Sequence, residues 1–167
     1  MAVRELRYFG DPVLKTVCDP VTRFDKTIES LVTDLLDTVK LPGRAGLAAP
    51  QIGVSLRVFS YNVEGLIGYV INPEVAELSE ETREFDEGCL SVPQIWFPTV
   101  RSTRALVRGV DIHNNPIEVE GTGVLAQALQ HETDHLDGKL YLERLTPERK
   151  KQAMREARDK DWFWKRD

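Results

Sequence analysis

Apolar residues recur with helical spacing in the segment that follows residue 25. They stand at i, i+3, i+4 and i+7 intervals, which places them on one face of a helix. Asp25 or Thr27 is expected to cap the N-terminus of this helix, and Pro42-Gly43 to end it. The pattern predicts a core-facing helix without chemistry of its own, whose apolar positions are Ile28, Leu31, Val32, Leu35, Leu36 and Val39.

The pattern changes between residues 56 and 122, where short segments favour strands. These segments are rich in β-branched or aromatic residues and lie between turn signals. Asn114-Asn115-Pro116 predicts a turn between the last two of them. We therefore expect strands at residues 56–61, 68–71, 105–110 and 117–120.

Three further helices are predicted outside this region. Asp11-Pro12 begins a short helix that ends near Asp19-Pro20, because an N-cap aspartate precedes a proline at the first helical position. Thr122 is expected to cap a helix over about residues 123–136, and Asp137-Gly138 to stop it. A last, mostly charged helix begins near Thr146-Pro147.

The order of these elements predicts an α+β fold. We expect antiparallel or mixed β-sheets packed around a central helix, residues 123–136, with flanking N- and C-terminal helices. Val124, Ala128, His131 and His135 form one stripe of the central helix, so this helix is expected to be buried. No internal repeat, low-complexity tract or linker interrupts the 167 residues, which predicts one domain over residues 1–167, with 147–167 as a charged C-terminal helix or tail.

Composition and charge narrow the class of protein. The chain is 41% hydrophobic and 29% charged, as in globular proteins, and its net charge of −5 argues against a global nucleic-acid-binding role. There is no run of ~18 apolar residues that would predict a membrane span. Residues 1–12 carry charges where a signal peptide needs an apolar core, so a cytoplasmic location is expected.

The C-terminal segment differs in charge from the rest of the chain. Residues 146–167 hold eight Lys or Arg and five Asp or Glu, together with the aromatic run Trp162-Phe163-Trp164. Two interpretations stay open: a tail that docks on the ribosome, or a helix whose aromatic side chains pack back on the domain.

The chemistry is concentrated at His131-Glu132-Thr133-Asp134-His135, an H-E-x-x-H sequence. In a helix, residues i and i+4 lie on one face about one turn apart, so two imidazoles can bind one metal ion. Glu132 then projects beside the metal and can transfer protons for a bound water. The motif predicts a metal-dependent hydrolase but leaves its class open.

The third metal ligand separates the classes. In one class of metalloproteases the motif extends to H-E-x-x-H-x-x-G-x-x-H, but the last histidine position is Tyr141 here. Cys89, in the turn-like sequence Glu87-Gly-Cys-Leu-Ser91, is the upstream candidate, since a thiolate binds borderline metals well. The downstream carboxylates remain alternatives, namely Glu143, Glu148 and Glu156. Cys18 is expected to be structural, and His113 to lie in a turn.

Three motifs occur in a fixed order: Gly46-Leu-Ala-Ala-Pro-Gln51, Glu87-Gly-Cys-Leu-Ser91 and Gln130-His-Glu-Thr-Asp-His135. Together they resemble the peptide deformylase family, whose members remove the formyl group from the N-terminal methionine of new bacterial polypeptides. One departure is visible. The first motif of the family usually reads G-x-G-L-A-A-x-Q, and Arg44 stands at its first glycine, which puts a cation at the rim of the expected cleft.

The resemblance implies a catalytic set. One divalent metal ion is held by Cys89, His131 and His135; ferrous iron is expected, with zinc, nickel or cobalt as substitutes. Glu132 serves as general base and then general acid while a metal-bound hydroxide attacks the formyl carbon, releasing formate. The side-chain amide of Gln51 and the backbone N–H of Leu90 stabilise the developing oxyanion.

The resemblance also implies how substrate binds. N-formylmethionyl peptides on nascent chains are expected to lie extended along the cleft, near Gly46 and the segment after Cys89. Phe85, Val124, Leu125 and Ala128 are candidates for the wall of the methionine pocket, although each is equally explained as core. Glu87 is expected to pair with Arg101 and orient the cysteine loop, the alternative being an exposed ion pair worth ~0–1 kcal/mol.

Two other functions compete with this interpretation. A metallopeptidase that cuts internal peptide bonds predicts a carboxylate as third ligand. A non-catalytic peptide-binding module with a structural metal is the second alternative, but a purely structural site has no need of Glu132.

Overall fold

The computed structural model describes residues 2–165. Its helices are α1 (Lys26–Val39), α2 (Gly123–Leu136), α3 (Pro147–Arg158) and α4 (Asp161–Trp164). Its strands are β1 (Gly46–Ala48), β2 (Val58–Val63), β3 (Leu66–Leu78), β4 (Thr82–Cys89), β5 (Val92–Ser102), β6 (Arg104–Val110) and β7 (Pro116–Thr122). Short 3₁₀ helices lie at Pro12–Lys15, Ala49–Ile52 and Tyr141–Arg144.

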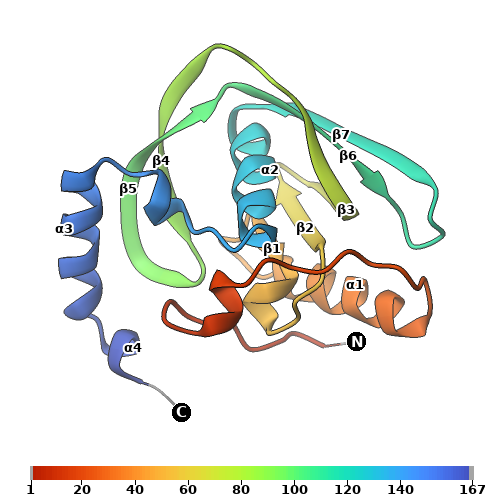
Figure 1. Ribbon diagram of the computed structural model, residues 1–167, viewed down its shortest axis with the longest axis horizontal. Coiled ribbons are helices and arrows are strands. Elements are labelled where there is room, and N and C mark those ends of the chain that lie inside the picture. Colours follow the sequence, from red (N-terminus) through yellow and green to blue (C-terminus); the bar gives the residue numbers. More distant parts are fainter. Residues whose placement is uncertain (1, 166–167) are drawn as a thin grey trace.

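Two antiparallel sheets frame the molecule, which confirms the predicted α+β class. Five strands form one sheet in the order β1-β2-β3-β6-β7, and β4 pairs with β5 in a separate hairpin. β3 is long because its first half pairs with β2 and its second half with β6, across two register shifts. Figure 1 shows α2 in the centre of the fold, between the larger sheet and the β4–β5 hairpin.

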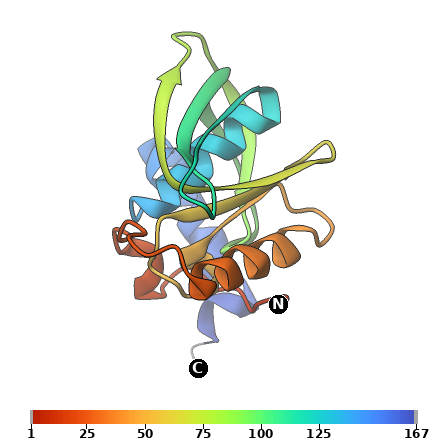
Figure 2. The same cartoon turned by 90° about the vertical axis from the view of Figure 1, so that its right-hand side faces the viewer.

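The two main helices cover opposite faces of the larger sheet. Successive residues of a strand point to opposite faces. In β2, Phe59 and Tyr61 belong to the apolar cluster that includes residues of α2, whereas Val58 belongs to the cluster built on α1. Figure 2 shows α1 below the sheet and α2 above it. The central helix is therefore buried, as predicted, although Val124 in its first turn is 48% exposed.

The ends of the helices follow local rules in most cases. Asp25, rather than Thr27, caps α1: its side chain accepts a hydrogen bond of 3.0 Å from the backbone N–H of Thr27. Thr122 precedes α2 as predicted, but its side chain forms no capping hydrogen bond. After α2, Gly138 has φ +73°, and a Cβ there would lie 2.8 Å from the carbonyl oxygen of Lys15. Glycine at position 138 thus allows the helix to end there and leaves room for the backbone of Lys15, in the N-terminal segment.

Two predictions about elements need correction. The expected helix between Asp11 and Asp19 is only one 3₁₀ turn, Pro12–Lys15, because the following backbone pairs elsewhere: the N–H of Cys18 donates to the carbonyl of Leu136. The second correction concerns β4 and β5, two strands that the sequence pattern does not predict. Charged residues on the outer face of β4 and two prolines in β5 hide the alternation that identifies strands.

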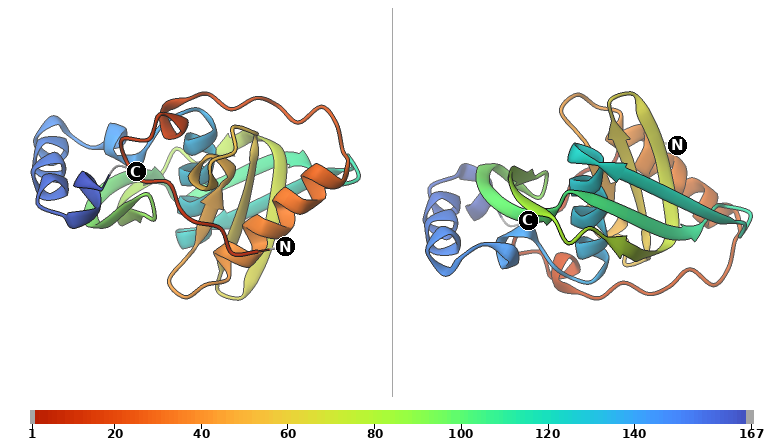
Figure 3. Two further views of the ribbon diagram at one scale, coloured as in Figure 1. Left: turned by 90° about the horizontal axis from the view of Figure 1, so that it is seen from below. Right: turned by 90° about the horizontal axis from the view of Figure 1, so that it is seen from above.

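The C-terminal helices pack on the β4–β5 hairpin, at the end of the molecule opposite α1 (Figure 3). Trp162 donates a hydrogen bond of 3.0 Å from Nε1 to the carbonyl oxygen of Pro93, and Phe163 stacks on Phe9 with ring centroids 6.2 Å apart. Two of the three aromatic residues thus pack back on the protein, while Trp164 is 67% exposed. None of the described helices is long and apolar enough to cross a membrane.

Candidate metal centre

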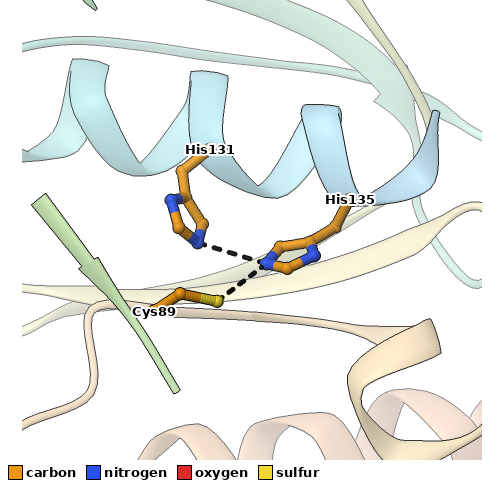
Figure 4. A group of neighbouring side chains, drawn as sticks. All are labelled: Cys89, His131 and His135. Carbon is orange, nitrogen blue, oxygen red and sulfur yellow. Dashed lines mark hydrogen bonds between the residues drawn. The ribbon is translucent and has the colours of Figure 1, made fainter. Parts of the chain in front are cut away.

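Three side chains converge between α2 and the β4–β5 hairpin (Figure 4). His131 and His135 project from one face of α2, and Cys89, the last residue of β4, faces them. Nε2 of His135 lies 3.3 Å from Sγ of Cys89 and 3.1 Å from Nε2 of His131. All three residues are buried, and their ligand atoms lie within 4.8 Å of one another.

This arrangement fits a metal ion. A tetrahedral site with metal–nitrogen and metal–sulfur bonds of about 2.0–2.3 Å separates neighbouring ligand atoms by roughly 3.3–3.6 Å, close to the observed spacing of the converging pairs. Two imidazoles and a thiolate form a donor set that suits borderline metals such as iron and zinc. Three protein ligands leave a fourth position for water or substrate, as a catalytic metal requires.

The two histidines differ in their electrostatic surroundings. Burial, and then the neighbouring His131, hold the pKa of His135 well below its usual range, so this imidazole is neutral and offers a lone pair. Burial also lowers the pKa of His131, but the facing Cys89 and the carboxylate of Glu87 outweigh it and raise the pKa well above its usual range. The region around His131 therefore favours positive charge.

Glu87 connects the metal site to a buried ion pair. Its Oε2 lies 2.9 Å from Nδ1 of His131, so the other ring nitrogen of His131 is directed at the metal position. The guanidinium of Arg101 donates two hydrogen bonds to the same carboxylate, at 2.9 and 2.6 Å. Although burial raises it, these partners lower the pKa of Glu87 to about 2. The predicted pairing of Glu87 with Arg101 is present, and it is buried rather than exposed.

The network continues to a residue that the sequence did not single out. Arg101 also donates to Asp134 at 2.8 Å, and Asp134 accepts two hydrogen bonds from Arg144, at 2.9 and 2.7 Å. Asp134 lies within the H-E-x-x-H motif, at one of its two unspecified positions. In the sequence, only the charge of Asp134 next to a metal ligand marks this residue. In the structure it links α2 to β5 through Arg101.

Gln51 directs its amide group toward the same site. Its Oε1 accepts a hydrogen bond of 2.9 Å from the backbone N–H of Ala48, which fixes the orientation of the amide. Nε2 then lies 3.2 Å from the hydroxyl of Ser91 and 3.7 Å from Sγ of Cys89. Ser91 is fully buried; only its place in the cysteine motif pointed to it.

Glu132 lies beside the metal ligands and against the backbone of β1. A Cβ at Gly46 would lie 2.8 Å from Cγ of Glu132 and closer still to its Oε1, so glycine makes room for this carboxylate. Burial raises the pKa of Glu132 to about 7, and its buried Oε2 has no hydrogen-bond partner among residues 2–165. The carboxylate is therefore free to accept a proton.

A cavity of about 550 Å³ opens onto this group. Gly46, Gln51, Cys89, Leu90, His131 and Glu132 line it, as do Val124 and Ala128 from the expected pocket wall. Phe85 and Leu125 do not, because Phe85 is buried under the guanidinium of Arg83 and Leu125 packs against Gly121. The cavity also takes in Leu6 and Tyr8 of the N-terminal segment, which carried no sequence signal.

Arg44 does not line the cavity. Its guanidinium turns away and donates a hydrogen bond of 3.1 Å to the carbonyl oxygen of Thr38, at the end of α1. The neighbouring Gly43 and Ala45 contribute to the rim instead.

The alternative third ligands lie elsewhere. Tyr141, at the position of the missing histidine, is buried and donates its hydroxyl to the carbonyl of Ile95. Glu143 pairs with Lys15 on the surface, Glu148 is exposed, and Glu156 accepts a hydrogen bond from a glutamine one turn away. Within residues 2–165 the group that can hold a metal is Cys89, His131 and His135.

Metal removal is expected to destabilise the fold, because the ion joins β4 to α2. A metal present at 1,000 times its Kd contributes about 4.1 kcal/mol, which corresponds to a Tm shift of roughly 8–16 °C for a chain of this size. Thermal unfolding with and without a chelator measures the shift. Cys89→Ala should abolish it, whereas His113→Ala, which changes the exposed third histidine, should retain it; a full shift in Cys89→Ala would contradict the ligand set.

The fold and the site define a metal-dependent hydrolase, in which a helix supplies two histidines and a buried glutamate and a facing hairpin supplies a cysteine. Comparisons with known proteins assign the family. The family model described as polypeptide deformylase matches residues 3–151. The chain therefore belongs to the peptide deformylase family, and it is a peptide deformylase by activity.

Relatives match nearly the whole chain. A peptide deformylase from Acidothermus cellulolyticus is 51% identical over 97% of this chain and 89% of its own length. Peptide deformylase 1 from Corynebacterium glutamicum is 46% identical over 98% of this chain and 99% of its own length. Among solved structures, a peptide deformylase from Legionella pneumophila superposes with a TM-score of 0.88 at 38% identity, covering 95% of each chain.

Proposed function

We propose that this protein removes the formyl group from N-formylmethionyl peptides on nascent chains and releases formate. The observation that carries the proposal is the convergence of Glu132 and Gln51 on a three-ligand metal site at the base of one cavity. Both side chains line the cavity, so a proton acceptor and a hydrogen-bond donor are available to the formyl group that is proposed to enter it.

The residues have separate roles in the proposed reaction. When bound, the metal ion supplies a Lewis acid that polarises oxygen and increases the acidity of water. Glu132 accepts the proton of the attacking water and delivers it to the leaving amine. Gln51 Nε2 and the backbone N–H of Leu90 donate hydrogen bonds to the formyl oxygen as negative charge develops on it. Glu87 and Arg101 act through His131, whose ring they orient.

Substrate binding is proposed to use the cavity that opens onto these groups. The peptide lies extended, with main-chain contacts at Gly46 and at the segment after Cys89. Val124 and Ala128 line the cavity beside Glu132 and are the proposed wall for the methionine side chain. Phe85 and Leu125, which face other parts of the protein, have no place in this wall.

The test follows formate release from formyl-Met-Ala by the metal-loaded protein. We expect formate from this peptide and no cleavage of unformylated peptides, which separates a deformylase from a metallopeptidase and from a non-catalytic binding module. Absence of formate with iron, zinc, nickel and cobalt, each loaded separately, would contradict the proposal.

Ferrous iron is the proposed native metal, with zinc, nickel or cobalt as substitutes. Cysteine and histidine ligation suits all four ions, so the metal has to be distinguished by its chemistry. We expect the iron form to lose activity in air within a day, through oxidation of the metal or of Cys89. A sample purified without oxygen, and then divided between air and an oxygen-free chamber, tests this. Equal activity in the two halves would exclude iron.

We also propose that the protein works in the cytoplasm, where nascent chains emerge, and contacts the ribosome through α3. This helix buries Ala153 and Ala157 against the protein and exposes basic side chains on its outer face. Reversing Lys150, Lys151 and Arg155 to glutamate should weaken co-sedimentation with ribosomes at low salt. Unchanged co-sedimentation of the folded triple variant would contradict the contact.

A further inference from the structure

The rim of the cavity carries an aromatic and acidic surface on the outer face of the β4–β5 hairpin. Trp96 of β5 and Asp86 of β4 both line the cavity, and Trp96 is 62% exposed. Neither residue is used in the proposed chemistry. Both belong to the hairpin that carries Cys89, so they lie close to any peptide whose formyl end reaches the metal site.

The register of the hairpin places these two side chains on one face. Asp86 pairs with Pro98, and residues two apart in a strand share a face, so Trp96 is the diagonal neighbour of Asp86. Diagonal neighbours lie about 7–8 Å apart, within the span of one long side chain. The inward positions of β4, such as Glu87 and Cys89, serve the metal site instead.

Gly88 holds the indole of Trp96 in place. A Cβ on Gly88 would lie only 2.5–2.8 Å from three carbons of the indole, Cε3, Cζ3 and Cδ2. The ring therefore lies across the backbone of Gly88, with one face covered and the other open toward solvent. Any larger residue at position 88 would displace the ring from this position.

Acidic side chains predominate in the lining of the cavity, and Arg149, on the same outer face, is paired with Glu84 and hydrogen-bonded to the carbonyl of Pro98. Among the described residues that line the cavity there is no lysine or arginine, whereas Asp86, Glu87 and Glu132 all line it. Glu87 is neutralised by Arg101, and Glu132 is buried at the base. Asp86 is exposed and forms no ion pair with residues 2–165. It is therefore an available negative charge at the rim.

We propose that Trp96 and Asp86 form a subsite for a cationic side chain of the peptide, downstream of the formylmethionine. An indole face attracts an ammonium or guanidinium group placed within about 6 Å of its centre, and a carboxylate nearby adds an ion-pair partner. The subsite favours lysine or arginine and disfavours acidic residues. This inference rests on the proposed function, since it concerns the peptide that the enzyme deformylates.

The test compares kcat/KM for formyl-Met peptides that carry lysine, norleucine or glutamate at the second, third or fourth position. Norleucine keeps most of the aliphatic chain of lysine and lacks its charge. At one position we expect lysine to exceed glutamate about tenfold, or ~1.4 kcal/mol, with the difference mainly in KM because the contact is remote from the reacting bond. Raising the KCl concentration from about 0.05 to 0.5 M should reduce this ratio, since exposed charges are screened.

Two variants assign the effect to the subsite. Asp86→Asn should lower the ratio of lysine to glutamate to about threefold or less, and Trp96→Leu should weaken both lysine and norleucine relative to glutamate. Glu84→Gln is the matched control: Glu84 lies on the same face of β4 but pairs with Arg149 and does not line the cavity, so the ratio should stay unchanged.

Two outcomes would overturn the subsite. One is equal kcat/KM for lysine and glutamate at all three positions. The other is a lysine preference that survives both Asp86→Asn and Trp96→Leu. A failure of the proposed function gives a different result, because formate would then be released from none of the peptides, including formyl-Met-Ala.

Discussion

Replacement of Glu132 by glutamine is expected to reduce formate release from formyl-Met-Ala by a factor of ~10²–10⁴, the usual range for loss of a general base. Glutamine keeps the volume of the side chain, which matters because a Cβ at Gly46 would already collide with it. The amide cannot accept a proton from water at neutral pH. The loss should appear in kcat, since proton transfer belongs to the transition state.

The metal content of this variant decides how the loss is interpreted. Glu132 is not one of the three ligands, so the variant should bind metal as the wild type does. Glu148→Gln, an exposed change on α3, serves as the control and should keep full activity. More than a tenth of wild-type activity in metal-loaded Glu132→Gln would contradict the proposed role.

Replacement of Arg101 by methionine is expected to lower the free energy of unfolding by about 3–5 kcal/mol. The side chains of Arg101 and Glu87 are each 2% exposed, so the variant leaves a carboxylate buried without its cation. Asp134 loses a partner as well, but keeps Arg144. Removing one member of a buried pair costs far more than the pair itself contributes, because the remaining charge cannot reach water.

Arg104 provides a matched control for the Arg101 variant. Its side chain pairs with the exposed side chains of Glu77 in β3 and Glu120 in β7. Arg104→Met should therefore lower the free energy of unfolding by no more than ~1 kcal/mol. Urea unfolding of the metal-loaded proteins measures both values. If the two variants lose similar stability, the buried network does not support the fold as proposed.

The pair of Glu87 and Arg101 makes the free energy of unfolding depend on pH in the acidic range. The pKa of Glu87 is lowered from 4.5 to about 2, so its ionised form stabilises the folded state. This contribution is present above about pH 4.5 and is lost as the pH falls from there through about 2. Arg101→Met removes a main cause of the shift. Arg101→Met should therefore be less stable than the wild type near neutral pH, and its free energy of unfolding should fall less than that of the wild type when acid protonates Glu87.

The parts of the site that depend on local spacing can be predicted from the sequence. His131 and His135 share a helix face because they are four residues apart. Spacing alone leaves the third ligand open between Cys89 and the downstream carboxylates, and the resemblance to the family selects Cys89. The helix that follows residue 25 is predicted because its apolar positions repeat regularly. Its cap is narrowed to Asp25 or Thr27 by the sequence, and the structure selects Asp25. Such features depend on near neighbours in the chain.

Features that depend on distant contacts could not be predicted in the same way. Asp134 and Arg144 resemble surface charges in the sequence, yet they join a buried network, because β5 brings Arg101 to Asp134, which binds both arginines. The strands β4 and β5 escaped detection because their polar positions serve the metal site on one face and the cavity rim on the other. Leu125 is a candidate for the methionine pocket under the family resemblance, but its side chain packs against Gly121 of β7.

The alternation of β4 constrains how this hairpin can evolve. Phe85, Glu87 and Cys89 point inward, while Asp86 and Gly88 point outward. A deletion or insertion of one residue in this strand would exchange the two sets, because side chains in a strand alternate with a period of two. A single substitution on the outer face of β4, in contrast, leaves the side chains of the inner face in place. Changes in the length of the hairpin would remove the sulfur ligand and the rim together, so we expect its length to be preserved while its outer residues diversify.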